Sequence, residues 1–393
     1  RYMRLSSLNG KTGFTMNGID GGDQSGLAVS GAGDVDKDGY DDVIIGAPHN
    51  ADGGEAYAFL GKKSGYKSSF DLDDLDGSNG FTVHTDIVVT TDHLGMAVGP
   101  AGDVDGDGYD DILLGSTDKN DQYLLWGEAS RQSSNWTSNL PDDLYIETGT
   151  AQMDDFHNRW VDTVGDVNGD GKDDFIIGEA WDDADNDGNG IAFDSGQSWV
   201  IFGGSKSSLG TRLKVADLDG TNGFAIPGVD VYDLSGNAVS GTGDLNDDGY
   251  DDIIVGAKYG DAGGGASGEA YVIFGKSSFS DIVDPARLNG SSGFRLDGAD
   301  GGDQAGFSVS EAGDVNGDGI ADLLVGAPYA DPDNRSSAGE VYVVFGKKSG
   351  YQSTWDLDSL TDSEGFVVQG IDPNDNAGHA INAAGDVNKD GYD

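Results

Sequence analysis

The sequence predicts an all-β protein built from repeated four-stranded sheets, and three observations support this prediction. An acidic block of the form Gly-Asp-x-Asp/Asn-x-Asp-Gly recurs at intervals of 63 to 78 residues. Its first aspartates are Asp34, Asp103, Asp166, Asp244, Asp314 and Asp386. Short β-branched and aromatic runs bounded by Gly, Asp and Asn surround each block, and helical periodicity is absent over any useful length. Repetition at this spacing indicates one supersecondary unit per repeat.

Each unit has the same order of expected strands. A strand of small residues such as 27–30 comes first, the acidic loop follows, and an apolar run such as 42–48 comes next. A third strand such as 269–275 and a fourth such as 80–83 complete the unit. Small residues suit a strand that crowds round a central axis, so radial repetition of these units predicts a β-propeller. A parallel β-helix has much shorter turns, and a row of separate β-domains would expose the faces of lone sheets.

We expect residues 1–393 to form a single β-propeller domain of six or seven four-stranded blades when complete. Its acidic loops span 34–42, 103–111, 166–174, 244–252 and 314–322, with a partial loop at 386–393. The sixth unit stops at Asp393, so the last blade is truncated in this chain. Segment 13–16 resembles a fourth strand without its blade, and it could complete the last blade of a closed ring.

The charge balance excludes nucleic acid as a partner and favours cations. The 71 acidic residues outnumber 22 basic ones, whereas phosphate binding needs clustered Lys and Arg. A salt-adapted solvated surface is the alternative, but many of the acids recur at fixed loop positions. No Cys is present, which excludes disulfides and thiolate metal sites, and metal ions could serve as staples instead. No apolar stretch approaches the roughly 18 residues of a membrane span.

The acidic loops have the chemistry of calcium sites. In the first loop Asp34, Asp36 and Asp38 occupy positions 1, 3 and 5, and Gly at position 6 permits a sharp turn. Position 7 would donate its backbone carbonyl, which is why residues as different as Tyr, Lys and Ile occur there. Position 9 closes the shell. The fifth unit has Ala321 at position 8 and Asp322 at position 9, so the aspartates at position 8 are expected outside the first shell.

The predicted ligands are Asp34, Asp36, Asp38, Tyr40 and Asp42; Asp103, Asp105, Asp107, Tyr109 and Asp111; Asp166, Asn168, Asp170, Lys172 and Asp174; Asp244, Asn246, Asp248, Tyr250 and Asp252; Asp314, Asn316, Asp318, Ile320 and Asp322; and Asp386, Asn388, Asp390 and Tyr392. They predict about five or six Ca²⁺ ions, one per loop. The loop is not an EF-hand, because position 12 is Ile45 and strands flank it. Turns rich in Asp and Gly that bind no metal are the alternative. The recurrence of the same residue types at the same position of each repeat favours metal binding.

The loops differ in one ligand, which predicts a ranking of affinity. Position 3 is Asp in the first two loops and Asn in the others. Since fewer carboxylates weaken calcium binding, we expect the third to fifth sites to lose calcium first. Residues 183–188, with Asp194 at position 12, are a further candidate loop, for which a solvated acidic loop is an equal alternative.

The repeats resemble those of a known family. Phe274-Gly275 closes one strand and Gly46-Ala47-Pro48 closes another, as in the FG-GAP repeats of integrin alpha chains and many bacterial surface proteins. Two units depart from the pattern, with Lys258 and Ser116 where the family has Pro or Ala. The resemblance implies calcium loops on one face of a propeller and ligands on the opposite face. The loops at 47–55, 179–195, 257–268 and 327–339 would then line the ligand face.

The expected function is therefore an extracellular, calcium-stabilised propeller that serves as an adhesion or ligand-binding module of a cell-surface or secreted protein. Its partner would be a protein or carbohydrate, and Arg159 and Trp160 near the axis are candidate ligand contacts. Alternatively, Trp160 plugs the channel and Arg159 pairs with local acids. Because common catalytic motifs are missing, no enzymatic activity is expected. Two other functions stay open: a self-assembling surface filament or layer, and a non-catalytic propeller attached to a secreted hydrolase or lyase.

Overall fold

The computed structural model describes residues 7–50, 53–84, 93–116, 121–129, 143–148, 159–182 and 194–393, without the side chains of Asp121 and Arg159. The chain divides into two compact units, which are described separately. Unit 1 comprises Arg1–Phe156 and Gly204–Ala216, and unit 2 comprises His157–Gly203 and Asp217–Asp393. The candidate loop at 183–188 lies outside the described residues.

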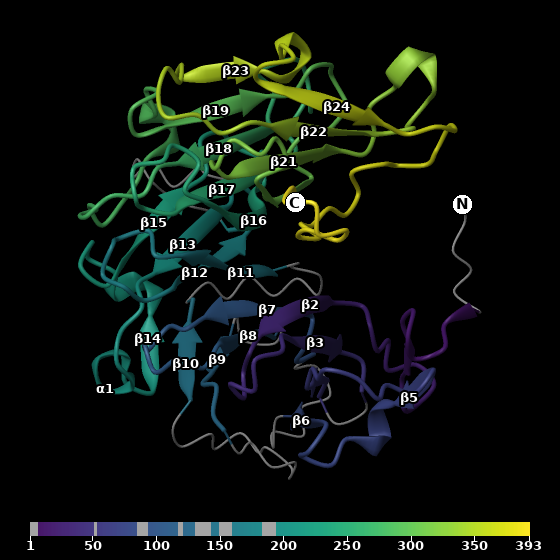
Figure 1. The fold of residues 1–393 in the computed structure, drawn as a ribbon. Coiled ribbons are helices and arrows are strands. Elements are labelled where there is room, and N and C mark those ends of the chain that lie inside the picture. The colour runs from purple at the N-terminus through teal and green to yellow at the C-terminus, as the bar shows by residue number, and fades with distance from the viewer. Residues whose placement is uncertain are drawn as a thin grey trace. The chain divides into compact units, whose positions relative to one another are not determined.

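Unit 1 contains two blades, each with its strands in sequence order across the sheet (Figure 1). Blade 1 consists of β2 (Val29–Gly33), β3 (Asp42–Ala47), β4 (Glu55–Phe59) and β6 (Gly80–His84). Blade 2 consists of β7 (Ala97–Gly102), β8 (Asp111–Gly115), β9 (Asp121–Leu125) and β10 (Leu144–Glu147). Neighbouring strands within these blades are antiparallel.

Unit 2 contains three blades of the same plan. Blade 3 consists of β11 (Arg159–Gly165), β12 (Asp174–Glu179), β13 (Gln197–Ile201) and β15 (Gly223–Pro227). Blade 4 consists of β16 (Ser235–Gly243), β17 (Asp252–Ala257), β18 (Glu269–Ile273) and β19 (Gly293–Asp297). Blade 5 consists of β20 (Ser308–Gly313), β21 (Asp322–Ala327), β22 (Glu340–Val344) and β24 (Gly365–Gln369). The prediction of an all-β fold with four-stranded, propeller-type blades is confirmed.

The blades of one unit stack through their apolar faces. In unit 2, Ile254, Val272 and Phe294 of blade 4 share one buried cluster with Leu323 and Val325 of blade 5. Successive residues of a strand point to opposite faces, so the second strand of a blade serves two such clusters and is apolar throughout. All six residues of β17 are buried accordingly. Burying one such side chain stabilises the fold by about 1.5–3 kcal/mol.

A short parallel strand adds to the outer edge of some blades, and the sequence analysis did not predict it. We call this segment the strap. The strap β14 (Arg212–Lys214) pairs with β10, and the strap β23 (Thr354–Asp356) pairs with β19. Each strap belongs to the connection that leads to the next blade's fourth strand. Three-residue strands carry too little sequence pattern to be recognised.

The N-terminal segment follows the same rule. Strand β1 (Thr15–Asn17) pairs in parallel with the strap β5 (Ser69–Asp71). Thr15, Met16 and Asn17 face successive strap residues in the register that Arg295, Leu296 and Asp297 of β19 adopt with β23. The segment thus makes the pairing of a fourth strand. The other regular elements among the described residues are short: α1 (Lys206–Leu209) and 3-10 turns at Leu72–Asp74, Val215–Asp217, Pro285–Arg287, Pro332–Asn334 and Leu357–Ser359.

Candidate metal sites

The acidic loops join the first strand of each blade to the second. We call them loops 1 to 5 after their blades, and the segment 386–393 is loop 6. In all six, the Asp at position 1 accepts hydrogen bonds from the backbone of its own loop. In loop 4, Asp244 accepts from the N–H of Asp248 at 2.9 Å and of Gly249 at 2.8 Å. Asp248 in turn accepts from the N–H of Tyr250 at 3.1 Å.

These bonds wind the chain into a tight turn that requires glycine at position 6. Gly249 has a φ of 93°, a conformation that other residues rarely adopt. The equivalent glycines of the other loops have φ values between 85° and 94°. The turn keeps the side chains at positions 1, 3 and 5 on its inner side, which is the arrangement that a short oxygen-ligand site needs.

The Asp at position 9 ties each complete loop to the rest of its blade. Asp252 is fully buried, and its two oxygens accept from the N–H of Leu245 at 3.0 Å and of Gly275 at 2.8 Å. Gly275 is the glycine of the Phe-Gly pair that follows β18. A Cβ atom added there would lie 2.3 Å from the backbone oxygen of Asp251, so a larger residue does not fit. The Phe-Gly motif and the acidic loop therefore form one structure.

The same two bonds recur in the other complete loops. The carboxylates are Asp42, Asp111, Asp174 and Asp322, and their N–H partners are Val35 and Gly61, Val104 and Gly127, Val167 and Gly203, and Val315 and Gly346. Burial raises the pKa of Asp42 to about 7, of Asp111, Asp174 and Asp252 to about 8, and of Asp322 to about 6. Burial thus disfavours the charged form of these carboxylates, and a nearby divalent cation would offset that cost.

The loops differ in how closely their carboxylates approach. Three carboxylates bring oxygens within 4.8 Å of one another in loop 1, through Asp34, Asp36 and Asp42. Asp103, Asp105 and Asp107 do so in loop 2. In loop 3 the position-3 residue is an amide, and Asn168 donates to both oxygens of Asp174 at 3.3 Å. Loop 3 has thereby replaced a charge repulsion with an internal hydrogen bond.

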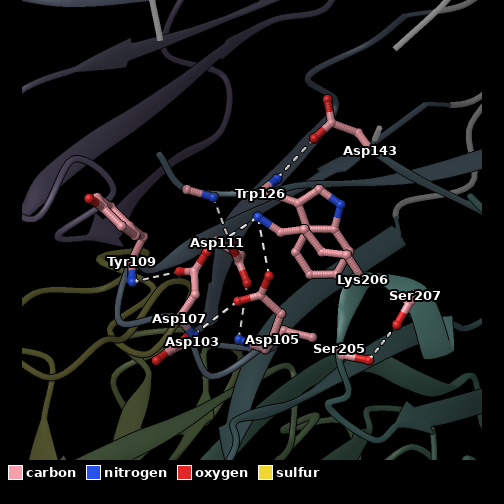
Figure 2. Close-up of polar contacts among 12 residues, drawn as sticks. Asp103, Asp105, Asp107, Tyr109, Asp111, Trp126, Asp143, Ser205, Lys206 and Ser207 are labelled. Carbon is pink, nitrogen blue, oxygen red and sulfur yellow. Dashed lines mark hydrogen bonds and ion pairs between the residues drawn. The ribbon is translucent and has the colours of Figure 1, made fainter. Parts of the chain in front are cut away.

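Loop 2 also contacts an ammonium group that the sequence analysis missed (Figure 2). Lys206 Nζ lies 3.1 Å from an oxygen of Asp105 and 3.3 Å from an oxygen of Asp107. It also lies over the ring of Trp126, 5.2 Å from the ring centre. Lys206 opens helix α1, and the N–H of the nearby Gly204 donates to the oxygen of Val104 in loop 2 at 2.8 Å. One positive charge thus stands beside two predicted ligands.

A second group of acids lies at the other end of the blades, at the start of the third strand and in the connection that enters the first strand. The phenol of Tyr271 donates to Glu269, and Tyr342 donates to Glu340 at 2.6 Å. Burial, followed by the nearby Glu269, raises the pKa of Asp233 to about 7. An aspartate stands 11 residues before position 1 in every unit, and the Glu-x-Tyr pattern also occurs at Glu55 and Tyr57. Periodicity therefore carried a signal for these residues that the sequence analysis did not use.

The remaining predicted ligand contact is only partly described. Trp160 lies in β11 and is 43% exposed, whereas the side chain of Arg159 is outside the described residues. Trp160 is therefore accessible, and its assignment as a ligand contact stays a prediction.

The fold and the loops together define a repeat protein of propeller-type blades with acidic hairpin loops. A family model described as the FG-GAP repeat matches residues 25–59, 235–273 and 305–344. The matched segments contain the first three strands of blades 1, 4 and 5 with their acidic loops. The family model thus finds three FG-GAP repeats in this chain, in agreement with the resemblance that the sequence predicted.

Curated relatives support this assignment. The chain is 32% identical over 247 residues to integrin alpha pat-2 of Caenorhabditis elegans, covering 60% of this chain and 18% of that protein. It is 33% identical to human integrin alpha-6 over 32% of this chain and 10% of that protein. It is 29% identical to the phosphatidylinositol-glycan-specific phospholipase D of Dictyostelium discoideum, over 44% of this chain and 18% of that protein. The matches thus span less than a fifth of these relatives' length.

None of the helices in the described part of the chain has the length and apolar character needed to cross a bilayer.

Proposed function

We propose that this chain is a calcium-stabilised FG-GAP propeller that acts as an adhesion or ligand-binding module of a cell-surface or secreted protein. One observation carries the proposal: six loops in one phase present oxygen-bearing side chains on a turn held by the same backbone hydrogen bonds. The similarity to integrin alpha chains supports the assignment to the cell surface.

In each complete loop, the side chains at positions 1, 3, 5 and 9 and the carbonyl at position 7 would hold one Ca²⁺ ion. Calcium accepts six to eight oxygens at flexible geometry, whereas magnesium needs a tight octahedron. The bound ion would supply the positive charge that the buried Asp at position 9 lacks. Modest affinity suits the millimolar calcium outside cells. Occupation of all loops would give about five or six ions per chain.

We further propose that residues 1–393 form one propeller domain and that partners bind at the end of the blades away from the acidic loops. The connections at 257–268 and 327–339 differ in sequence and length between blades 4 and 5, while their acidic loops keep the same length. Variable loops on a repeated scaffold are where recognition usually lies. A protein or carbohydrate ligand fits this proposal, and self-assembly is the alternative outcome. The chain itself would not be an enzyme.

A thermal melt tests the calcium assignment. We expect excess chelator to lower Tm by more than about 10 °C relative to millimolar calcium, because ions that bind only the folded state stabilise it by mass action. Calcium should restore the Tm, and magnesium should not. An unchanged Tm in protein that metal analysis shows to be calcium-free would contradict the proposal.

The match to a phospholipase D favours a second candidate function, a non-catalytic propeller attached to an enzymatic domain. Sequencing the whole gene would distinguish the two, because a hydrolase domain beyond this segment is expected only for the second. The purified segment 1–393 should be inactive on phosphatidylinositol-glycan substrates under both candidates.

A further inference from the structure

The aspartates at position 8 contact the loop of the preceding blade. In unit 1, Asp110 belongs to loop 2, and its carboxylate accepts from the backbone N–H of Asp34 in loop 1 at 2.7 Å. The N–H of Asp110 donates to the backbone oxygen of Asp34 at 3.3 Å. Two hydrogen bonds thus hold position 1 of one loop against position 8 of the next.

The same pair of bonds recurs twice in unit 2. Asp251 of loop 4 accepts from the N–H of Asp166 in loop 3 at 2.8 Å, and its own N–H donates back at 3.3 Å. Asp393 of loop 6 accepts from the N–H of Asp314 in loop 5 at 3.0 Å, and its N–H donates back at 3.4 Å. Three blade boundaries therefore share one arrangement, which is evidence of a built contact.

The glycine before position 1 makes room for this contact. A Cβ atom added to Gly33 would lie 2.2 Å from the carboxylate of Asp110, and one added to Gly165 would lie 2.2 Å from that of Asp251. Both glycines have positive φ, at 69° and 67°. At these two boundaries the glycine that opens the acidic block is thus required both by its own backbone conformation and by the carboxylate of the neighbouring blade.

One boundary of unit 2 lacks the bond. Blade 5 has Ala321 at position 8, and its side chain faces Gly243, the residue before Asp244 of loop 4. A methyl group cannot accept a hydrogen bond. Loop 4 is therefore a natural comparison, with the same fold and ligand types as loop 3 but without the carboxylate from the next blade.

We propose that the position-8 aspartate is a positioning residue that couples the calcium sites of adjacent blades. Asp110 stands between Tyr109 and Asp111, which are predicted ligands of loop 2, while it fixes Asp34, a predicted ligand of loop 1. Calcium in loop 2 orders the chain around Asp110 and so preorganises loop 1. By linkage, calcium in loop 1 favours binding in loop 2 to the same degree. This inference rests on the calcium proposal above.

The chain offers a matched control and a gain-of-function variant. Asp41 is the position-8 residue of loop 1, and it is exposed. Asp41 and Asp110 occupy the same position in their own loops. Asp41→Ala therefore removes from position 8 of loop 1 the same charge that Asp110→Ala removes from position 8 of loop 2. Ala321→Asp would place the missing carboxylate against loop 4.

The experiment follows the backbone amide signals of Gly39, Gly108 and Gly249 by NMR while calcium is added stepwise to the full chain. Each of these N–H groups donates to the position-1 carboxylate of its own loop, so each reports one site. We expect Asp110→Ala to weaken binding at loop 1 about tenfold, because a charge-assisted hydrogen bond is lost. Asp41→Ala should change the calcium affinity of loop 1 by less than about twofold. Ala321→Asp should raise the calcium affinity of loop 4 several-fold.

The outcomes separate this inference from the calcium proposal. Equal midpoints at loop 1 in the Asp110→Ala and Asp41→Ala variants, with an unchanged loop 4 in Ala321→Asp, would overturn the coupling alone. Glycine signals that do not respond to calcium in the unmodified chain would overturn both. If Asp110→Ala does not fold, Ala321→Asp decides the question by itself.

Discussion

The two ends of blade 4 both bury acidic side chains, but they do so in different ways. At the loop end, Asp244 and Asp252 accept hydrogen bonds from backbone N–H groups of the loop and the Phe-Gly turn. At the other end, Asp233 is 5% exposed beside Glu269, whose carboxylate accepts from the phenol of Tyr271. No side-chain hydrogen bond to Asp233 is found among the described residues.

The comparison teaches that acidity alone does not mark a metal site. At the loop end, the carboxylates stand on alternate residues of one turn and face its inner side. Backbone N–H groups of the same turn donate hydrogen bonds to them. The other end places like charges near one another without that order, and its Asp233 is stabilised by retaining a proton. Regular spacing of ligands, and not their number, distinguishes the two ends.

The largest effect should come from removing the position-9 aspartate at the loop end of blade 4. Asp252→Ala leaves the buried N–H groups of Leu245 and Gly275 without an acceptor and deletes a predicted ligand. We expect the free energy of unfolding in excess calcium to fall by about 3 kcal/mol or more. Urea unfolding measures it. Asp362→Ala, at an exposed turn, is the control, with an expected change within about 0.5 kcal/mol. Equal losses of unfolding free energy in both variants would show that the position-9 aspartate does not stabilise the fold.

A smaller effect should follow from Lys206, which distinguishes loop 2 from loop 1. Lys206→Met removes an ammonium beside Asp105 and Asp107, so calcium no longer competes with it. We expect affinity at loop 2 to rise roughly fivefold, from a charge interaction of about 1 kcal/mol in water. Lys348→Met is the control, because Lys348 contacts Asp247 at position 4, which is no predicted ligand. Amide signals of Gly108 and Gly249 during calcium addition measure both.

The unmodified loops should also differ from one another. The number of carboxylates predicts a higher calcium affinity for loops 1 and 2 than for loops 3 to 5. Lys206 should lower the calcium affinity of loop 2 below that of loop 1. We therefore expect loop 1 to release calcium last as chelator is added, and loops 3 to 5 to release it first. Site-resolved release in the opposite order would refute the ranking.

The smallest effect concerns Asp233 and appears as a pH dependence. Its pKa is 3.8 in ordinary surroundings and about 7 in the fold. The unfolded chain loses this proton near pH 4 and the folded chain near pH 7, so the associated stability is present below pH 4 and lost as pH rises to 7. Asp233→Asn should become more stable relative to the unmodified chain over that interval. Asp362→Asn, at an exposed turn, should not. Urea unfolding at constant calcium from pH 4 to 8 measures the difference.

The sequence predicted what recurs within one blade. Period and composition gave the four strands, and the loop pattern gave Asp252 at position 9 because Ala321 excluded position 8. Contacts between blades were not predictable in this way. Lys206 reaches Asp105 across 101 residues of chain, and Asp110 reaches Asp34 across 76. A repeat pattern states which residues are equivalent, but it does not state which of them touch once the sheets stack.

The straps have a consequence for how this protein can be divided. The outermost strand of blades 2 and 4 has its open edge covered by a segment of the following repeat. A piece cut at the repeat boundary would expose the backbone groups of that strand to pairing with another molecule. In blade 5, β24 has Val367 and Val368 exposed and no strap among the described residues. A fragment that is to keep the edge of β10 or β19 covered must therefore extend through the strap, to roughly residue 217 or 359, which is most of a repeat beyond the end of the covered strand.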